Sequence, residues 1–195
     1  LKEGREGTDI HFVGNIMIDS LFNNLEKAKS STILSDLGVT DGDYAVLTLH
    51  RPSNVDNSKT LVGIIEALEV ISKKLKLVFP IHPRTEKNAK MFNLYKRICN
   101  IPGIVLTGPM GYLDFISLTS NARIVLTDSG GLQEETTALK IPCITLRENT
   151  ERPITVTEGT NQVVGSDCNN IIDAFHASIA KDYNSVSVPE KWDGK

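Results

Sequence analysis

Residues 122–152 read ARIVLTDSGGLQEETTALKIPCITLRENTER, and this stretch decides the fold. Its apolar run at 124–126 is continuous and rich in β-branched residues, which is typical of a strand buried on both faces of a parallel sheet. The run ends at 127–131 (TDSGG), where glycines allow a sharp turn and the close approach of a ligand. Residues 132–139 contain helix formers and no helix breaker. The order of strand, small-residue turn and helix therefore predicts a parallel α/β unit.

The turn of this unit predicts a binding site for an anion. The first amides of a helix have no hydrogen-bond partner within the helix, and they lie at the positive end of its dipole. Glu134 and Glu135 follow within the first turns, where a carboxylate suits the dipole even without a ligand. A carboxylate at this place can also accept hydrogen bonds from both hydroxyls of a ribose, and we assign that role to Glu135. The pattern favours a nucleotide as the ligand.

Strands and helices alternate through the rest of the chain. Short apolar runs predict further strands at 10–13, 44–49, 75–81, 103–107, 143–146 and 162–164. Apolar residues at helical spacing predict helices at 16–25, 57–74, 86–98, 112–121 and 171–181. This alternation predicts an α/β fold, a Rossmann-like parallel sheet with helices on both faces. Ligands of such folds bind at the carboxyl ends of the strands.

Histidines and arginines follow several predicted strands at that end. His50 and Arg51 come after the strand at 44–49, and residues 82–84 (HPR) follow the next strand. A histidine at such a place either marks the solvent-exposed end of a strand, or contacts a phosphate oxygen or moves a proton near neutral pH. Residues 147–152 carry two arginines and two glutamates. They form either an exposed loop whose charges pair with one another or an arginine fork for phosphate.

The composition excludes several classes of function. The chain has 195 residues, of which 40% are hydrophobic, and a formal net charge of -3, so it folds as one or at most two domains. No basic stripe indicates nucleic-acid binding, and no apolar run approaches the ~20 residues of a membrane helix. Cys99, Cys143 and Cys168 lie far apart, which predicts reduced thiols in a cytoplasmic protein. The sequence contains no P-loop and no dinucleotide fingerprint, and we expect neither a metal nor a cofactor.

Four groups of motifs occur in a fixed order along the chain. They are Val13-Gly14-Asn15 with Ile18-Asp19, Leu49-His50-Arg51, Thr127-Asp128-Ser129-Gly130-Gly131 with Gln133-Glu134-Glu135, and Thr150-Glu151-Arg152-Pro153 with Glu158-Gly159-Thr160. In this order and spacing they resemble the carboxyl-terminal half of the non-hydrolysing UDP-N-acetylglucosamine 2-epimerases. One departure is Ser53-Asn54, where members of that family often have Glu-Asn.

The resemblance implies one lobe of a glycosyltransferase-B-type two-domain fold. Residues 1–9 would be a linker between lobes, 10–183 the UDP-binding domain, and 184–195 a tail that crosses to the missing amino-terminal lobe or is disordered. The family interconverts UDP-N-acetylglucosamine and UDP-N-acetylmannosamine by eliminating UDP and adding it back to a 2-acetamidoglucal. The full-length protein would be a homodimer that serves the synthesis of a surface polysaccharide.

The resemblance also implies roles for individual residues. His50 would be the catalytic residue that stabilises the departing UDP. The residues implied to bind UDP are Arg51, Phe115, Ser129, Gly130, Gly131, Glu135 and Arg152. The acidic groups for proton transfer at C2 would lie in the missing lobe, so this chain would bind UDP and be inactive alone. Two other hypotheses stay open, namely the nucleotide-sugar-binding domain of a transferase and a non-catalytic nucleotide-sugar sensor.

Overall fold

The computed structural model describes residue 8, residues 10–183 and residues 185–194. Within these residues, parallel strands form a six-stranded sheet in the order β3-β2-β1-β4-β5-β6, which is the strand order of the Rossmann fold. The strands are β1 (Tyr44–Thr48), β2 (Lys76–Pro80), β3 (Ile104–Thr107), β4 (Ile124–Thr127), β5 (Cys143–Thr145) and β6 (Asn161–Val163). The prediction of a parallel α/β sheet is confirmed.

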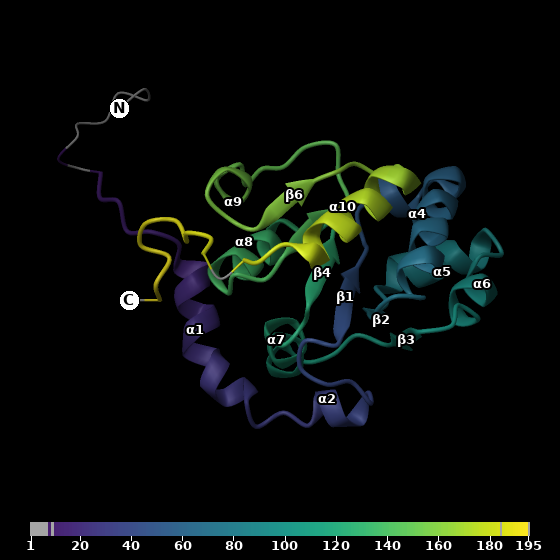
Figure 1. Ribbon diagram of the computed structural model, residues 1–195, viewed down its shortest axis with the longest axis horizontal. Helices are drawn as coiled ribbons and strands as arrows, with labels where there is room; N and C mark the ends of the chain where they lie inside the picture. Colours follow the sequence, from purple (N-terminus) through teal and green to yellow (C-terminus); the bar gives the residue numbers. More distant parts are fainter. Residues whose placement is uncertain (1–7, 9, 184, 195) are drawn as a thin grey trace.

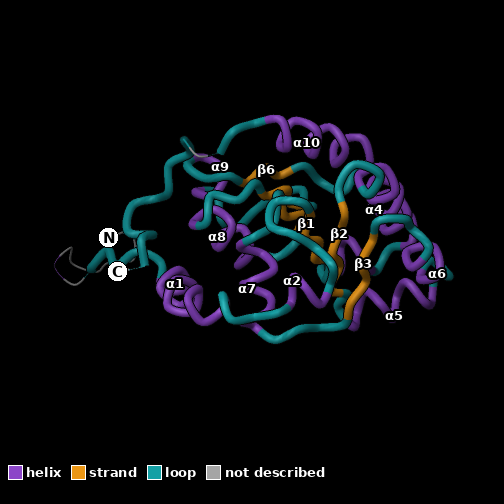
Figure 2. Tube along the Cα trace, turned by 60° about the horizontal axis from the view of Figure 1, so that its bottom comes forward, coloured by secondary structure: helices purple, strands orange, loops and turns teal. Residues whose placement is uncertain are grey.

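Helices cover both faces of the sheet (Figures 1 and 2). The longer ones are α1 (Ile16–Ala28), α4 (Ser58–Ile71), α5 (Pro83–Met91), α7 (Tyr112–Ser120), α8 (Gly130–Ala138) and α10 (Cys168–Ala180). The shorter ones are α2 (Ile33–Asp36), α3 (Pro52–Val55), α6 (Tyr95–Cys99) and α9 (Ile154–Thr157). None of the helices in the described part of the chain is long and apolar enough to cross a bilayer.

Alternate residues of each central strand pack against different helix layers. Leu47 and Phe79 belong to the core cluster that includes residues of α4 and α10. Val46 and Val78 belong to a second cluster, which includes residues of α7 and the partly buried residues of α2. Because both faces are covered, β1 and β4 are apolar at nearly every position, which is the pattern that the sequence shows.

Two predicted elements are wrong in detail. Residues 10–13 form no strand, and Phe12 and Val13 are largely exposed rather than paired with the sheet. The helix expected at 86–98 is two helices, because the chain turns at Asn93, which has a left-handed φ of 60°. Asparagine tolerates this conformation better than most residues. It is not a strong helix breaker, so the sequence pattern gave no sign of the turn.

The carboxyl-terminal residues lie beside α1 (Figure 1). Trp192 is 7% exposed and shares a cluster with Ile18 and Leu21 of α1. Lys191 Nζ donates a hydrogen bond of 2.6 Å to the backbone oxygen of Phe12. Apart from residue 8, the linker predicted at 1–9 lies outside the described residues. A crossing of the tail to a second lobe stays a prediction.

Candidate functional site

The candidate site lies where the sheet changes its winding direction. Strand β1 pairs with β4 in the middle of the sheet, while β2 and β3 extend to one side of β1, and β5 and β6 extend to the other side of β4. The connections that leave β1 and β4 therefore diverge, and they leave a crevice at the carboxyl ends of these strands. His50 follows β1 and Asp128 follows β4, so two parts of the chain far apart in sequence meet there.

Asp128 holds this crevice together. Its side chain is fully buried and accepts hydrogen bonds from the backbone amides of His50 (3.0 and 3.1 Å) and Arg51 (2.9 Å). The amide group of Asn54 donates to the same carboxylate at 3.1 Å, and His50 Nδ1 lies 2.8 Å from Oδ1. Burial alone would raise the pKa of Asp128, but the hydrogen bonds from His50 and Arg51 together lower it below the ordinary value. Asp128 is therefore a buried carboxylate that fixes the position of His50.

The loop after β4 presents the start of α8 to the crevice. Ser129 caps the helix without a side-chain hydrogen bond to it, and its own amide donates to Thr127 Oγ1 at 2.9 Å. The helix begins at Gly130, two residues earlier than the sequence predicted, so both glycines lie in its first turn. A Cβ atom on Gly131 would meet nothing within 4 Å. The loop therefore leaves open space beside the amides that an anion would contact.

Three arginines contribute nitrogens that lack hydrogen-bond partners among the described residues. The buried atoms are Arg51 Nε, Arg147 Nη1 and Arg152 Nε. Arg152 Nε lies 3.0 Å from Glu134 Oε1, but without the alignment of a hydrogen bond. A buried guanidinium nitrogen without a partner is costly, and phosphate oxygens are acceptors that suit it.

Glu151 lies among these arginines. Its carboxylate is 3.0 Å from Arg147 Nη2 and 3.8 Å from Arg51 Nη2. The hydrogen bond from Arg147 is the largest cause of a lowered pKa at Glu151, and the charges of Arg147, Arg51 and Arg152 act in the same direction. Positive charge therefore gathers at the start of α8, where the helix dipole adds to it.

The two adjacent glutamates of α8 have different surroundings. Glu134 is buried, accepts a hydrogen bond of 3.0 Å from Asn15 Nδ2 and pairs with Arg152. Glu135 is half-buried, and burial, followed by the negative charge of Glu134, raises its pKa to about 7. Glu134 therefore links α8 to the chain before α1, whereas Glu135 is the carboxylate that the structure does not pair with a cation.

An apolar cavity of about 400 Å³ lies next to His50. His82 borders it from the loop after β2, with its ring centroid 5.7 Å from that of His50. Phe115 of α7 lines the cavity and also packs partly buried against the core. His50 thus lies between an apolar cavity and a cationic site, an arrangement that fits a flat ring attached to an anion.

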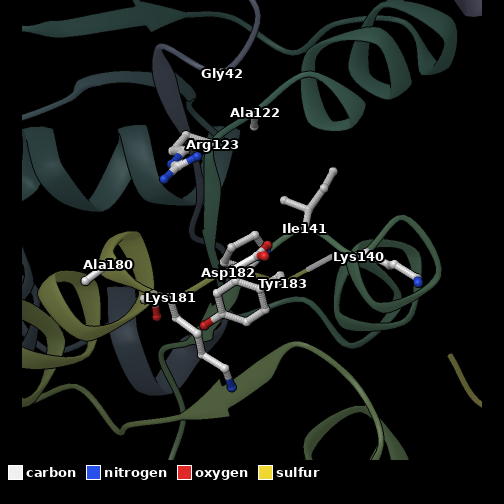
Figure 3. Close-up of a pocket in the computed structure, with 11 residues that line it drawn as sticks. Gly42, Ala122, Arg123, Lys140, Ile141, Ala180, Lys181, Asp182 and Tyr183 are labelled. Atoms are coloured by element: carbon white, nitrogen blue, oxygen red, sulfur yellow. The ribbon is translucent and has the colours of Figure 1, made fainter. Parts of the chain in front are cut away.

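A second recess, of about 460 Å³, lies at the amino ends of the strands, opposite the candidate site, and is the subject of Figure 3. Its basic residues are Arg123, Lys140 and Lys181, of which Lys140 and Lys181 follow the ends of α8 and α10. Arg123 Nη2 donates a hydrogen bond of 3.1 Å to the backbone oxygen of Ile179 in α10. The carboxyl end of a helix carries a partial negative charge, which attracts cations and repels an anion. This recess is therefore no candidate for the anion site.

The structure brings most of the predicted site residues together. His50, Arg51, Ser129, Gly130, Gly131 and Arg152 surround the start of α8, with Glu135 one turn further along the helix and Phe115 beyond His50. The sequence assigned no separate role to Asp128, and it gave His82 and Arg147 only as members of the groups 82–84 and 147–152, each with an alternative that needs no ligand. Each of these follows a strand directly or within two residues, and that position at the carboxyl end is the signal that could have identified them. Within the described part of the chain, no group of three or more His, Cys, Asp or Glu side chains could hold a metal ion.

Comparisons with known proteins place this geometry in a family. The family model described as UDP-N-acetylglucosamine 2-epimerase matches residues 1–194. The UDP-N-acetylglucosamine 2-epimerase of Methanocaldococcus jannaschii is 44% identical over 191 residues, which are 94% of this chain and 52% of that protein. The chain therefore spans about half the length of the curated relatives it matches.

Two solved structures show the same fold. The Methanocaldococcus jannaschii UDP-GlcNAc 2-epimerase in complex with UDP-GlcNAc and UDP has a TM-score of 0.86 and 40% identity, and the match covers 99% of this chain and 54% of that one. The heptosyltransferase WaaC of E. coli, with ADP, has a TM-score of 0.52 and 18% identity over 76% of this chain and 47% of that one. The likeness to the heptosyltransferase shows the fold alone, and it agrees with a Rossmann-like lobe of the glycosyltransferase-B type.

Proposed function

The chain belongs to the UDP-N-acetylglucosamine 2-epimerase family, and we propose that it is the nucleotide-binding half of an enzyme that interconverts UDP-N-acetylglucosamine and UDP-N-acetylmannosamine. The observation that carries this proposal is the set of buried guanidinium nitrogens at the start of α8, which have no hydrogen-bond partner among the described residues. A diphosphate supplies the acceptor oxygens that these nitrogens lack, and its negative charge suits the arginines.

The diphosphate would bind at the first turn of α8. The backbone amides of Ser129, Gly130 and Gly131 lie at the positive end of the helix dipole, and the glycines leave room for phosphate oxygens. Arg51 and Arg152 would contact the same group from two other loops. These contacts would neutralise the charge without a metal ion.

The two parts of the uridine, the ribose and the uracil, would contact different groups of the chain. Glu135 lies one turn into α8, where its carboxylate would accept hydrogen bonds from the ribose hydroxyls. The uracil ring would enter the apolar cavity and lie against Phe115, with His82 at its border. A flat aromatic ring fits a cavity of about 400 Å³ that is mostly apolar.

His50 would act on the leaving group of an elimination. A base removes the proton at C2 of the sugar, the C1–C2 double bond forms, and the C1–O bond breaks so that its electron pair leaves with UDP. Asp128 engages Nδ1 of His50, which leaves Nε2 as the ring atom for a phosphate oxygen. A donor in that place stabilises the charge that develops on UDP. The base would come from the amino-terminal half, so the isolated chain binds UDP and does not turn over.

A transferase of the same architecture is the second candidate function. It would use the same crevice to pass the sugar to an acceptor, and the fold shared with the heptosyltransferase is what favours it. Incubation of the whole protein with UDP-N-acetylglucosamine and no acceptor separates the two. Epimer formation supports the epimerase, and its absence with sugar transfer to an acceptor supports the transferase.

The cellular setting belongs to the same proposal. The described cysteines Cys99, Cys143 and Cys168 are free thiols, which agrees with a reducing cytoplasm. A homodimer of the whole protein is a further part of it, and light scattering of the whole protein measures its mass directly.

Binding of UDP to this chain is the direct experiment. We expect UDP at about 100 times its dissociation constant to stabilise the chain by about 2.7 kcal/mol and to raise the melting temperature by several degrees. ADP serves as the control for the base, CMP as the control for the base together with the second phosphate, and Glu135→Ala should remove most of the shift. A shift that is equal for UDP, CMP and ADP would contradict the uridine site.

A further inference from the structure

The carboxylate of Glu151 lies where the proposed function puts a phosphate group. Its Oε1 is 3.0 Å from Arg147 Nη2, and its Oε2 is 3.8 Å from Arg51 Nη2. The same Oε2 lies 3.8 Å from the position that a Cβ atom on Gly130 would take. A negative group of the protein therefore already stands at the start of α8, between two cations.

The exposures of these side chains show which partner can move. The side chain of Arg147 is 12% exposed, whereas that of Glu151 is 55% exposed. An exposed carboxylate regains water when it leaves an ion pair, so the pairing itself stabilises little. Arg147 is fixed by burial, and Glu151 is the partner that can turn into solvent.

Glu151 does not supply hydrogen-bond acceptors for all the nitrogens of the two arginines beside it. Arg51 Nε and Arg147 Nη1 remain buried without hydrogen-bond partners among the described residues, although Glu151 lies beside both guanidinium groups. A diphosphate carries more acceptor oxygens than a carboxylate and at least twice its negative charge. The site is therefore better matched to a diphosphate than to the carboxylate that occupies it.

We propose that Glu151 sets the affinity of the anion site, because it occupies the place of a phosphate group and must turn away before a diphosphate binds. This inference rests on the proposed function for the identity of the ligand as a diphosphate. The negative charge of Glu151 offsets the repulsion between the cations of Arg51 and Arg147. Its departure is part of the binding reaction, and it opposes that reaction by the strength of its own ion pairs.

Titration calorimetry with pyrophosphate and with UDP tests the proposal on Glu151→Gln. The variant keeps the shape of the side chain and removes its charge, so both ligands should bind about two- to fivefold more tightly, which corresponds to an exposed ion pair. Glu148→Gln is the matched control, because it removes the same charge from the same loop. The carboxylate of Glu148 lies instead against Gly165, where a Cβ atom would be 2.7 Å from its Oε1. The control should bind both ligands as the unchanged chain does.

The outcomes separate this proposal from the proposed function. Equal or weaker binding of both ligands to Glu151→Gln, with UDP selected over ADP, overturns the role of Glu151 and leaves the function standing. Tighter binding of pyrophosphate without selection of UDP over ADP supports the role of Glu151 and removes the uridine site. Failure of both ligands to bind any of the three proteins overturns both. Circular dichroism of each variant establishes that it is folded.

Discussion

His50 Nδ1 lies 2.8 Å from Asp128 Oδ1, and the backbone amide of His50 donates to the same carboxylate. One buried group thus fixes both the ring of His50 and the turn on which it stands. The two residues follow adjacent strands of the sheet and are 78 positions apart in sequence. The orientation of the histidine is therefore a property of the assembled sheet rather than of the loop after β1.

Replacement of Asp128 by asparagine should destabilise the chain. The carboxylate accepts hydrogen bonds from His50, Arg51 and Asn54. Asparagine would replace one of its two acceptor oxygens by an NH₂ group, so that some of these donors would lose their acceptor. We expect the free energy of unfolding to fall by about 2–4 kcal/mol. Denaturation by urea measures it, with Asp173→Asn on the exposed side of α10 as the control. Equal stability of the two variants would show that Asp128 is not the centre of this network.

Glu135 should make stability depend on pH. Its pKa in the folded chain is about 7, against an ordinary value of 4.5, so the folded state holds the proton more tightly than the unfolded state. The resulting stabilisation is complete below pH 4.5 and is lost as the pH rises through about 7. Relative to Glu135→Gln, the unchanged chain should therefore lose about 1–3 kcal/mol of unfolding free energy between these pH values.

Urea denaturation at a series of pH values checks this dependence. Glu26→Gln, on the exposed side of α1, serves as the control and should keep the pH profile of the unchanged chain. The same profile in Glu135→Gln would refute the raised pKa.

Gly131→Ala should separate binding from folding. A Cβ atom there meets nothing within 4 Å, and alanine favours a helix over glycine by about 0.5–1 kcal/mol, so stability should stay the same or rise. The added methyl group would occupy the space beside the amides of α8, and we expect UDP to bind at least about tenfold more weakly.

Gly159→Ala is the contrasting variant. A Cβ atom on Gly159 would lie 2.5 Å from Thr137 Cγ2 and from the backbone oxygen of Thr155, so this change should cost about 1–3 kcal/mol of stability. Thermal unfolding compares the two variants. If the Gly131→Ala variant binds UDP as tightly as the unchanged chain, the diphosphate does not bind beside Gly131.

The fluorescence of Trp192 should report the position of the carboxyl-terminal residues. It is the only tryptophan in the chain and is 7% exposed, so its emission should be that of a buried indole. A Cβ atom on Gly14 would clash with the backbone oxygen of Lys191, and Gly14→Ala should therefore shift the emission to longer wavelength.

Gly42→Ala is the control for this measurement. Both glycines have a positive φ, 81° for Gly14 and 73° for Gly42, but a Cβ atom on Gly42 meets nothing within 4 Å. Its emission should match that of the unchanged chain. An equal shift in both variants would mean that backbone strain, and not contact with Lys191, moves the tryptophan.

The sequence was sufficient for the elements whose patterns are local. The apolar runs of β1 and β4 are continuous in sequence, and the apolar residues of α4 recur at helical spacing, so periodicity locates these elements within a few residues. The presence of a helix after the turn at 127–131 followed from the small residues of that turn, although α8 starts at Gly130, two residues earlier than predicted. The strand predicted from the apolar run at 10–13 is absent. The residues of a short run do not show whether the edge of a sheet lies near enough to pair with it.

Partners from distant parts of the chain could not be predicted in the same way. Asp128 is one polar residue after a strand, and its importance appears only when β1 and β4 are adjacent and its oxygens meet His50 and Asn54. The same holds for Arg147, whose unsatisfied nitrogen depends on burial by the folded loop. Residue types indicated which kind of chemistry to expect, and the order of the strands determined which side chains meet in one site.

The close approach of Lys191 to Gly14 means that two segments near opposite ends of the described chain lie side by side. The hydrogen bond from Lys191 to the oxygen of Phe12 joins these segments further. A short peptide joining these two segments would turn the domain into a closed loop, and new ends could be cut at an exposed turn such as that at Gly38. Such a circular permutant would retain all the strand pairings, so the lobe is suited to insertion as a cassette within another protein.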